Sequence, residues 1–176
     1  MSADSVVRVA LIGDTHLPRF GRELPQPLLD ALAHADRILH AGDLTEPFVL
    51  DQLAELAPTD AVAGNNDPPE LAERLGYQRV VMVEDARIGL IHGDRGTGRT
   101  TPERAWRAFA GVEPAVHAIA FGHSHQPLVE RRDGVWTLNP GSPTDRRRQP
   151  TFSFVWIEVD GTVLTPKLVT FGPSRS

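Results

Sequence analysis

The strongest constraint in this sequence is a pattern that recurs at the ends of five short apolar runs. Each run reads as a buried strand and ends at glycine beside Asp, Asn or His, in the stretches GDTH, GDLTE, GNND, HGD and GHSH. Glycine lets the backbone turn tightly and approach a site closely. Because ligands of α/β sheets lie at the carboxyl ends of strands, five such loops can converge on one point. The pattern therefore predicts one polar site at a sheet edge.

Strand and helix patterns alternate over the first two thirds of the chain. Strands are expected at Val6–Ile12, Arg37–Ala41, Asp60–Ala63, Tyr77–Glu84, Arg87–His92 and Ala118–Phe121. Helical patterns occupy residues 25–35, 47–57, 68–75 and 101–110, with Asp67 expected as the N-cap of the third helix and Pro68 as its first residue. The last third reads as two β-hairpins, which pair Val129–Arg131 with Val135–Leu138 and Thr151–Val159 with Thr162–Val169.

This order of elements predicts an α/β fold in which mixed β-sheets carry helices outside and two sheets pack face to face. No linker divides the chain, so we expect a single domain over residues 1–176, with a core of about 6–170 and short flexible termini. The absence of cysteine, of a basic leader and of any apolar run near ~20 residues favours a cytoplasmic protein with no membrane partner.

The charge of the chain bears on its partners. A net charge of −5 argues against a general nucleic-acid binder. The basic run Arg146-Arg147-Arg148 is expected to be a solvated loop rather than a dedicated nucleic-acid patch. No lysine-bearing phosphate loop is present, which argues against nucleotide-driven chemistry. The oligomeric state stays open, a homo-oligomer included.

The strand ends supply four imidazoles, two carboxylates and one amide. These groups are Asp14, His16, Asp43, Asn65, His92, His123 and His125. Seven ligands are too many for one tetrahedral zinc ion, so two ions that share a carboxylate fit better. The mixed nitrogen and oxygen set suits Mn, Fe, Zn, Co or Ni and is too rich in imidazole for Mg or Ca. Two carboxylates only partly offset two divalent ions, so the pocket should attract an anion.

The order D-x-H, G-D, G-N-x-D, H-G and G-H-x-H resembles the calcineurin-like metallophosphoesterases. The length, the GNND and IHGD stretches and NPGS (Asn139–Ser142) are most similar to the small YfcE-type phosphodiesterase branch. The resemblance runs from about Val6 to Val159. It implies a four-layer α/β/β/α sandwich with a two-metal centre at one edge of the sheets.

The resemblance also implies roles for the residues of the site. One ion would be held by Asp14, His16, Asp43 and His125, and the other by Asp43, Asn65, His92 and His123, with Asp43 bridging. Manganese is the favoured metal, and a hydroxide held by both ions would attack a small phosphodiester in line. His40, three residues before Asp43, is a candidate for supporting the ligands.

One position departs from the larger members of the family. They carry a histidine, thought to protonate the leaving group, where this chain has Asn66. The small branch lacks that histidine as well, so Asn66 supports the placement within this branch and favours diesters over monoesters. By the same resemblance Asn66 and Asp43 are the expected catalytic residues, and Asn66 is also expected to contact the substrate.

Three alternatives remain open from the sequence. The Vps29 retromer subunits are similar in size and serve mainly in protein assembly, so a non-catalytic scaffold is one alternative, although every ligand position here is filled. A phosphomonoesterase or protein phosphatase is disfavoured by Asn66. A nuclease would require a basic track, for which Arg146–Arg148 is the only candidate.

Overall fold

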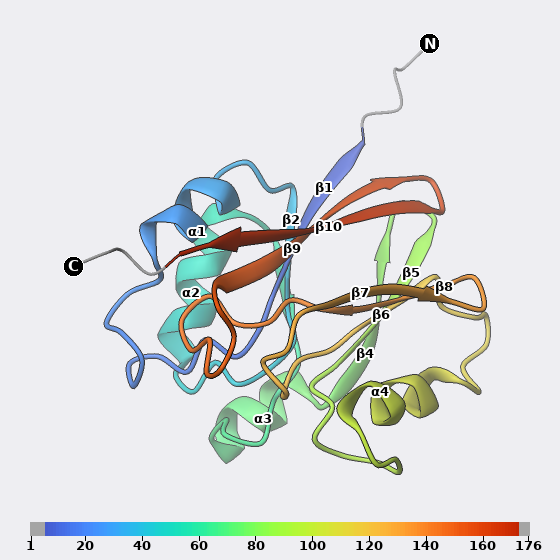
Figure 1. Ribbon diagram of the computed structural model, residues 1–176, viewed down its shortest axis with the longest axis horizontal. Coiled ribbons are helices and arrows are strands. Elements are labelled where there is room, and N and C mark those ends of the chain that lie inside the picture. Colours follow the sequence, from blue (N-terminus) through green and yellow to red (C-terminus); the bar gives the residue numbers. More distant parts are fainter. Residues whose placement is uncertain (1–5, 173–176) are drawn as a thin grey trace.

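Two five-stranded β-sheets form the centre of the computed structural model, which describes residues 6–172 (Figure 1). The expected flexible termini lie outside the described residues. The strands are β1 (Val7–Ile12), β2 (Arg37–His40), β3 (Thr59–Ala61), β4 (Gln78–Val83), β5 (Ala86–Ile91), β6 (Ala118–Ala120), β7 (Leu128–Arg132), β8 (Val135–Asn139), β9 (Phe152–Asp160) and β10 (Val163–Phe171). The helices are α1 (Gln26–Leu32), α2 (Pro47–Leu56), α3 (Pro69–Leu75) and α4 (Thr101–Phe109).

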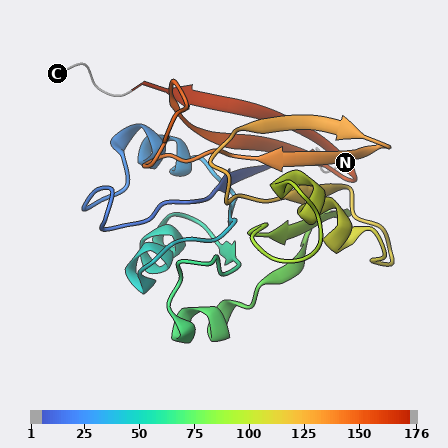
Figure 2. The same cartoon turned by 60° about the horizontal axis from the view of Figure 1, so that its bottom comes forward.

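Both sheets are mixed, as predicted. The first has the strand order β10-β9-β1-β2-β3, in which β1 runs parallel to β2 and antiparallel to β9. The second has the order β4-β5-β6-β8-β7, with β5, β6 and β8 parallel. The two predicted hairpins are present as β7–β8 and β9–β10, and β4 pairs with β5 in a third hairpin. Figure 2 shows the last two hairpins next to each other across the two sheets.

Three apolar layers hold these elements together. The middle layer lies between the sheets and includes Val9 and Leu11 of β1 together with Ile88 and Leu90 of β5. The alternate residues of β1 pack on the other face of their sheet, where α1, α2 and α3 contribute their apolar sides. Helix α4 covers the outer face of the second sheet. The predicted four-layer α/β/β/α sandwich is therefore confirmed.

The helices found in residues 6–172 are all too short, or too polar, to cross a membrane.

Two details of the elements differ from the prediction. Helix α3 begins at Pro69, with Pro68 as its N-cap, so the prediction of Asp67 as N-cap was wrong. The Asp67 carboxylate instead accepts hydrogen bonds from the backbone N–H groups of Asp43 and Thr45 in the loop after β2 and of Gly64 in its own loop. Strand β3 ends at Ala61 rather than at Ala63, because the N–H of Ala63 donates to Gly76 and not to the neighbouring strand.

Gly89 generates a prediction about packing. A Cβ atom at Gly89 of β5 would lie 2.8 Å from the ring of Phe109, which α4 presses onto the sheet. We expect Gly89→Ala to lower the free energy of unfolding by about 1–3 kcal/mol, because the ring must shift in a packed core. Urea unfolding followed by circular dichroism measures the change. Gly111→Ala is the matched control, since its Cβ meets no atom within 4 Å, and equal stabilities of the two variants would contradict the assignment.

Candidate metal centre

The loops that follow β1, β2, β3, β5 and β6 bring the seven predicted ligands to one edge shared by both sheets. Backbone hydrogen bonds join these loops. The N–H of His16 donates to the carbonyl of Asp43, and the N–H of Gly122 donates to the carbonyl of His92, both at 3.0 Å. The N–H of His123 donates to Asp14 Oδ2 at 3.0 Å and so connects the two sheets. The predicted convergence at a sheet edge is present.

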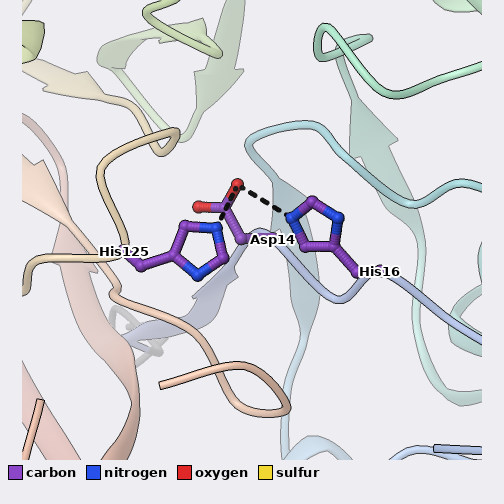
Figure 3. A group of neighbouring side chains, drawn as sticks. All are labelled: Asp14, His16 and His125. Atoms are coloured by element: carbon purple, nitrogen blue, oxygen red, sulfur yellow. Dashed lines mark ion pairs between the residues drawn. The ribbon is translucent and has the colours of Figure 1, made fainter. Parts of the chain in front are cut away.

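One group of ligands consists of Asp14, His16 and His125, all of them buried (Figure 3). Asp14 Oδ1 lies 3.8 Å from Nε2 of His16 and 3.5 Å from Nε2 of His125. The two imidazole rings stack with centroids 5.2 Å apart. These residues are three of the four ligands predicted for the first ion.

A second group forms around Asn65. Its Oδ1 lies 3.0 Å from His92 Nε2 and 3.2 Å from His123 Nδ1. Asp43 lies between the two groups, because its Oδ2 is 3.2 Å from His92 Nε2 and 3.4 Å from His16 Nε2. This is the position expected of a bridging carboxylate. Asp14 Oδ1 is also 3.9 Å from His92 Nε2, so both carboxylates lie where the two groups of ligands meet.

Unsatisfied polar atoms show that the site fits cations. Within residues 6–172, four buried side-chain atoms have no hydrogen-bond partner, and three of them are Asp14 Oδ1, His16 Nε2 and His125 Nε2. Leaving a buried polar group unpaired costs roughly 1–3 kcal/mol, and more for a charged group. The three atoms approach one another, so a single cation could accept all three lone pairs. The residues present therefore fit a metal ion.

Hydrogen bonds on the far side of two imidazoles orient these lone pairs. His92 Nδ1 donates to the carbonyl of Ala41 at 2.7 Å, and His125 Nδ1 donates to the carbonyl of Asp145 at 2.6 Å. With Nδ1 engaged in this way, Nε2 of each ring is the atom that can bind a metal. Such outer hydrogen bonds fix the tautomer and orientation of ligating histidines.

The electrostatics of the site favour positive charge. Burial opposes the charged form of His92, but its hydrogen bond to Asp43 and the charges of Asp14 and Asp43 outweigh burial and raise the pKa of His92 to about 9. Burial likewise opposes the charge on Asp43, but hydrogen bonds from His92 and Asn66 hold its pKa well below the usual range. A metal ion can supply the positive charge that the proton on His92 supplies in its absence.

The backbone at the site is strained. Asp14, His16, Asp43, His123 and His125 all have φ between 46° and 70°, a region that residues other than glycine rarely adopt. Each such residue costs on the order of 1 kcal/mol or more. Five of them together are comparable with the net stability of a small domain, about 5–15 kcal/mol. The surrounding hydrogen bonds and packing must therefore hold these loops firmly.

Two glycines of the pattern are required by the carboxylates they approach. A Cβ atom at Gly122 would lie 2.8 Å from Asp14 Oδ2, and a Cβ atom at Gly64 would overlap Asp43 Oδ1. A larger residue at either position would displace a carboxylate. The glycines beside the polar residues are thus part of the geometry of the site.

Several residues that position the ligands were missed from the sequence. Ser142 Oγ donates to the carbonyl of Asp14 at 2.8 Å, and Thr144 Oγ1 donates to the carbonyl of Thr15 at 2.6 Å. Asn139 donates to the carbonyl of Gly122 at 3.1 Å. Asn139 and Ser142 belong to the NPGS stretch, which marks the family resemblance but predicted no role in the site. This loop after β8 holds the ligand loops in place.

Asp67 was also given the wrong role. Its carboxylate accepts from the N–H groups of Asp43 and Gly64 at 2.9 and 2.7 Å and from that of Thr45 at 2.7 Å. It therefore joins the loops that follow β2 and β3.

His40 hydrogen-bonds to residues next to the predicted ligands. It is fully buried, its Nδ1 accepts from the N–H of Gly42, and its Nε2 donates to Thr15 Oγ1, both at 3.1 Å. Thr15 lies between Asp14 and His16, so His40 joins the loops after β1 and β2. Burial lowers the pKa of His40 to about 3, so the ring is neutral near pH 7.

Asn66 points at a ligand. Its backbone N–H and its Nδ2 donate to the two carboxylate oxygens of Asp43, at 2.8 and 2.9 Å. Its side chain is exposed. The predicted contact between Asn66 and substrate stays a prediction.

Known proteins are similar to this chain in sequence and in fold. The calcineurin-like phosphoesterase superfamily domain matches residues 7–162, which include all seven ligands. A probable metallophosphoesterase of Methanothermobacter thermautotrophicus is 35% identical over 164 residues, which cover 93% of this chain and 92% of that protein. A probable metallophosphoesterase of Methanocaldococcus jannaschii is 36% identical over 136 residues, which cover 77% of this chain and 68% of that protein. The solved structure of Entamoeba histolytica Vps29 complexed with Zn²⁺ has a TM-score of 0.71 and 25% identity, and the similarity covers 94% of this chain and 100% of that chain.

The position of Asp43 between the groups predicts the metal content of a variant. Asp43→Ala should lose both ions, because one carboxylate serves both groups, whereas the wild type should hold two ions per chain. Elemental analysis after dialysis against a divalent salt measures the ratio. Asp60→Ala removes a partly buried carboxylate that pairs with Arg37 and Arg79, and this control should keep both ions. Two ions per chain in Asp43→Ala would refute the shared ligand.

His40 predicts how the stability of the metal-free protein depends on pH. The unfolded chain takes up a proton at His40 near pH 6.5, whereas the folded chain does so only near pH 3. The free energy of unfolding should therefore fall as pH decreases from 6.5 toward 3, and His40→Gln should lack this component. Urea unfolding at a series of pH values in chelator measures it. His34→Gln, at an exposed position, is the control and should keep the wild-type slope, and an equal slope in His40→Gln would contradict the buried neutral ring.

Proposed function

Because the chain belongs to the calcineurin-like phosphoesterase superfamily, we propose that it hydrolyses small phosphodiesters at a centre of two divalent metal ions. The observation that carries the proposal is the set of buried, unpartnered ligand atoms on Asp14, His16 and His125. Such atoms at the end of strained loops have no structural use of their own. The names of the two Methanothermobacter and Methanocaldococcus relatives support the same class of reaction.

We assign the ligands as the two groups suggest. Asp14, His16, Asp43 and His125 would hold one ion, and Asp43, Asn65, His92 and His123 the other. Manganese is the proposed metal, with Ni, Co, Fe and Zn suited to the same mixture of imidazole and carboxylate. When bound, two such ions lower the pKa of water toward neutrality and polarise phosphoryl oxygens.

The residues of the chain prepare the site for an anion. Two carboxylates offset only half of the charge of two divalent ions, so a net positive charge faces the substrate. A diester carries one negative charge and a monoester dianion carries two. The site therefore has less substrate charge to neutralise when it binds a diester. The hydrogen-bonded loops hold the ligands in place before substrate arrives, which avoids reorganisation during the reaction.

Asn66 sets the dependence on the leaving group. Its amide can donate a hydrogen bond, but it cannot deliver a proton near neutral pH. Its Nδ2 already lies 2.9 Å from Asp43 Oδ2, beside the proposed position of the metals. A leaving group next to Asn66 would depart as an anion, which favours acidic leaving groups.

The alternatives receive less support. The similarity to Vps29 fits a scaffold, but the relatives named probable metallophosphoesterases favour the enzyme. A nuclease would need unpaired basic side chains to bind the nucleic-acid backbone. Arg146 instead donates to the carbonyl of Gln149, and Arg147 lies 3.7 Å from the Asp145 carboxylate. We also propose that the chain forms one domain and works in the cytoplasm, where a chain without cysteine is at no disadvantage.

The leaving-group argument gives the test of the function. Metal-loaded wild type should hydrolyse aryl phosphodiesters at rates that fall steeply as the pKa of the leaving phenol rises. Asn66→His should raise the rates of the poorest leaving groups most, because general acid assistance is worth about 10²–10⁴-fold. Rates of phenolate release across the series measure both slopes.

Asn66→Gln is the control, since it keeps an amide and should keep the steep slope. A shallow slope in the wild type would show that another acid protonates the leaving group. Absence of hydrolysis by protein shown to hold two metal ions would refute the proposed activity and favour the scaffold.

A further inference from the structure

A hollow of about 370 Å³ lies beside the metal centre and is lined by segments from three parts of the chain. Phe20 and Glu23 follow β1, Gln26 begins α1, Thr144 belongs to the loop after β8, and Phe152 and Phe171 come from β9 and β10. Figure 1 shows α1 and the end of β10 at the same end of the molecule. We propose that this hollow binds the nucleobase of a small nucleotide diester whose phosphate lies at the metal centre. The inference rests on the proposed function and names its substrate class.

Two walls of the hollow are in direct contact with the ligand loops. The ring of Phe20 meets the ring of His16 edge to face, with centroids 5.9 Å apart. Thr144 donates to Thr15, which lies between the ligands Asp14 and His16. One side chain therefore separates the hollow from a predicted metal ligand. A phosphate held by the metals and a ring in the hollow can belong to the same molecule.

The walls carry the chemistry that recognises a base. Phe152 and Phe171 are paired across β9 and β10, with ring centroids 5.6 Å apart and planes inclined by 30°. Phe20 adds a third ring, which is 40% exposed. Aromatic side chains bind nucleobases by stacking on their faces, whatever the base. An alkyl arm on the phosphate would leave these surfaces uncovered.

Charged groups of both signs border the hollow: Glu23 lines it, while the guanidinium carbons of Arg19 and Arg146 lie 5.3 and 6.0 Å from the ring centroids of Phe20 and Phe152. Glu23 would repel another phosphate, and its carboxylate can accept a hydrogen bond from an exocyclic amine. Gln26 is held in place by donating to Asp30 Oδ1 at 2.7 Å. The amide and the carboxylate offer partners to the edge of a base, which a plain phenyl ring cannot use. A nucleobase can use both the aromatic walls and these hydrogen-bonding groups, whereas a simple aryl group can use only the walls.

The test measures binding, so it does not depend on turnover. Isothermal titration of the metal-loaded protein compares adenosine 5′-monophosphate, phenyl phosphate and methyl phosphate, which present the same phosphate to the metals. We expect adenosine 5′-monophosphate to bind about tenfold more tightly than methyl phosphate, with phenyl phosphate between them. Phe171→Ala, and independently Phe20→Ala, should reduce that ratio about fivefold or more. Phe48→Ala is the control, because Phe48 is also 40% exposed but lines no part of the hollow.

The outcomes separate this inference from the proposed function. If the protein hydrolyses diesters but binds adenosine 5′-monophosphate no better than methyl phosphate, the hollow is not a base site and the activity stands. If hydrolysis fails but the binding ratio is large and falls in Phe171→Ala, the base site stands and the activity does not. Phenyl phosphate binding as tightly as adenosine 5′-monophosphate would overturn the assignment to a nucleobase.

Discussion

Two buried carboxylates facing the same imidazole are the constraint on which this structure depends. Asp14 and Asp43 both come within 4 Å of His92 Nε2, and both are almost completely buried. A buried charge costs several kcal/mol unless it is paired and hydrogen-bonded. The backbone N–H of His123 reaches one carboxylate, and Asn66 reaches both oxygens of the other. The remaining negative charge is what would attract cations to the site.

The positive φ angles of the ligand loops raise the energy of the folded chain. Hydrogen bonds between these loops hold them in place. Left-handed backbone at the ligands turns their side chains inward from the strand ends. His40, Asp67 and Ser142 then tie the loops to one another through backbone groups. A site held in this way has little freedom to rearrange when metal or substrate binds, which is the property that catalysis by positioning needs.

The sequence allowed much of this to be predicted, since strand patterns and the glycines that follow them are local signals. Convergence of the ligands followed from the rule that strand ends share an edge. The supporting residues could not be found in the same way, because Ser142 and Asp14 are 128 residues apart in the chain. Asp67 shows the limit of local rules. Its sequence context suits a helix cap, but its carboxylate accepts from two backbone N–H groups of the loop after β2 and from that of Gly64 in its own loop. The hollow beside Phe20 depends on three distant segments, and no local pattern marks it.

The place of β1 in its sheet governs how the protein can be made. β1 is synthesised first among the strands, yet it lies in the middle of its sheet, between β2 and the late strand β9. Asp14, at its end, meets the backbone of His123 only after 109 further residues have been added. A nascent chain that ends before His123 would therefore lack part of the candidate ligand set, and β1 lacks one neighbour until β9 (Phe152–Asp160) has emerged. Capture of an ion by the full ligand set would therefore be a late event in the synthesis of this fold.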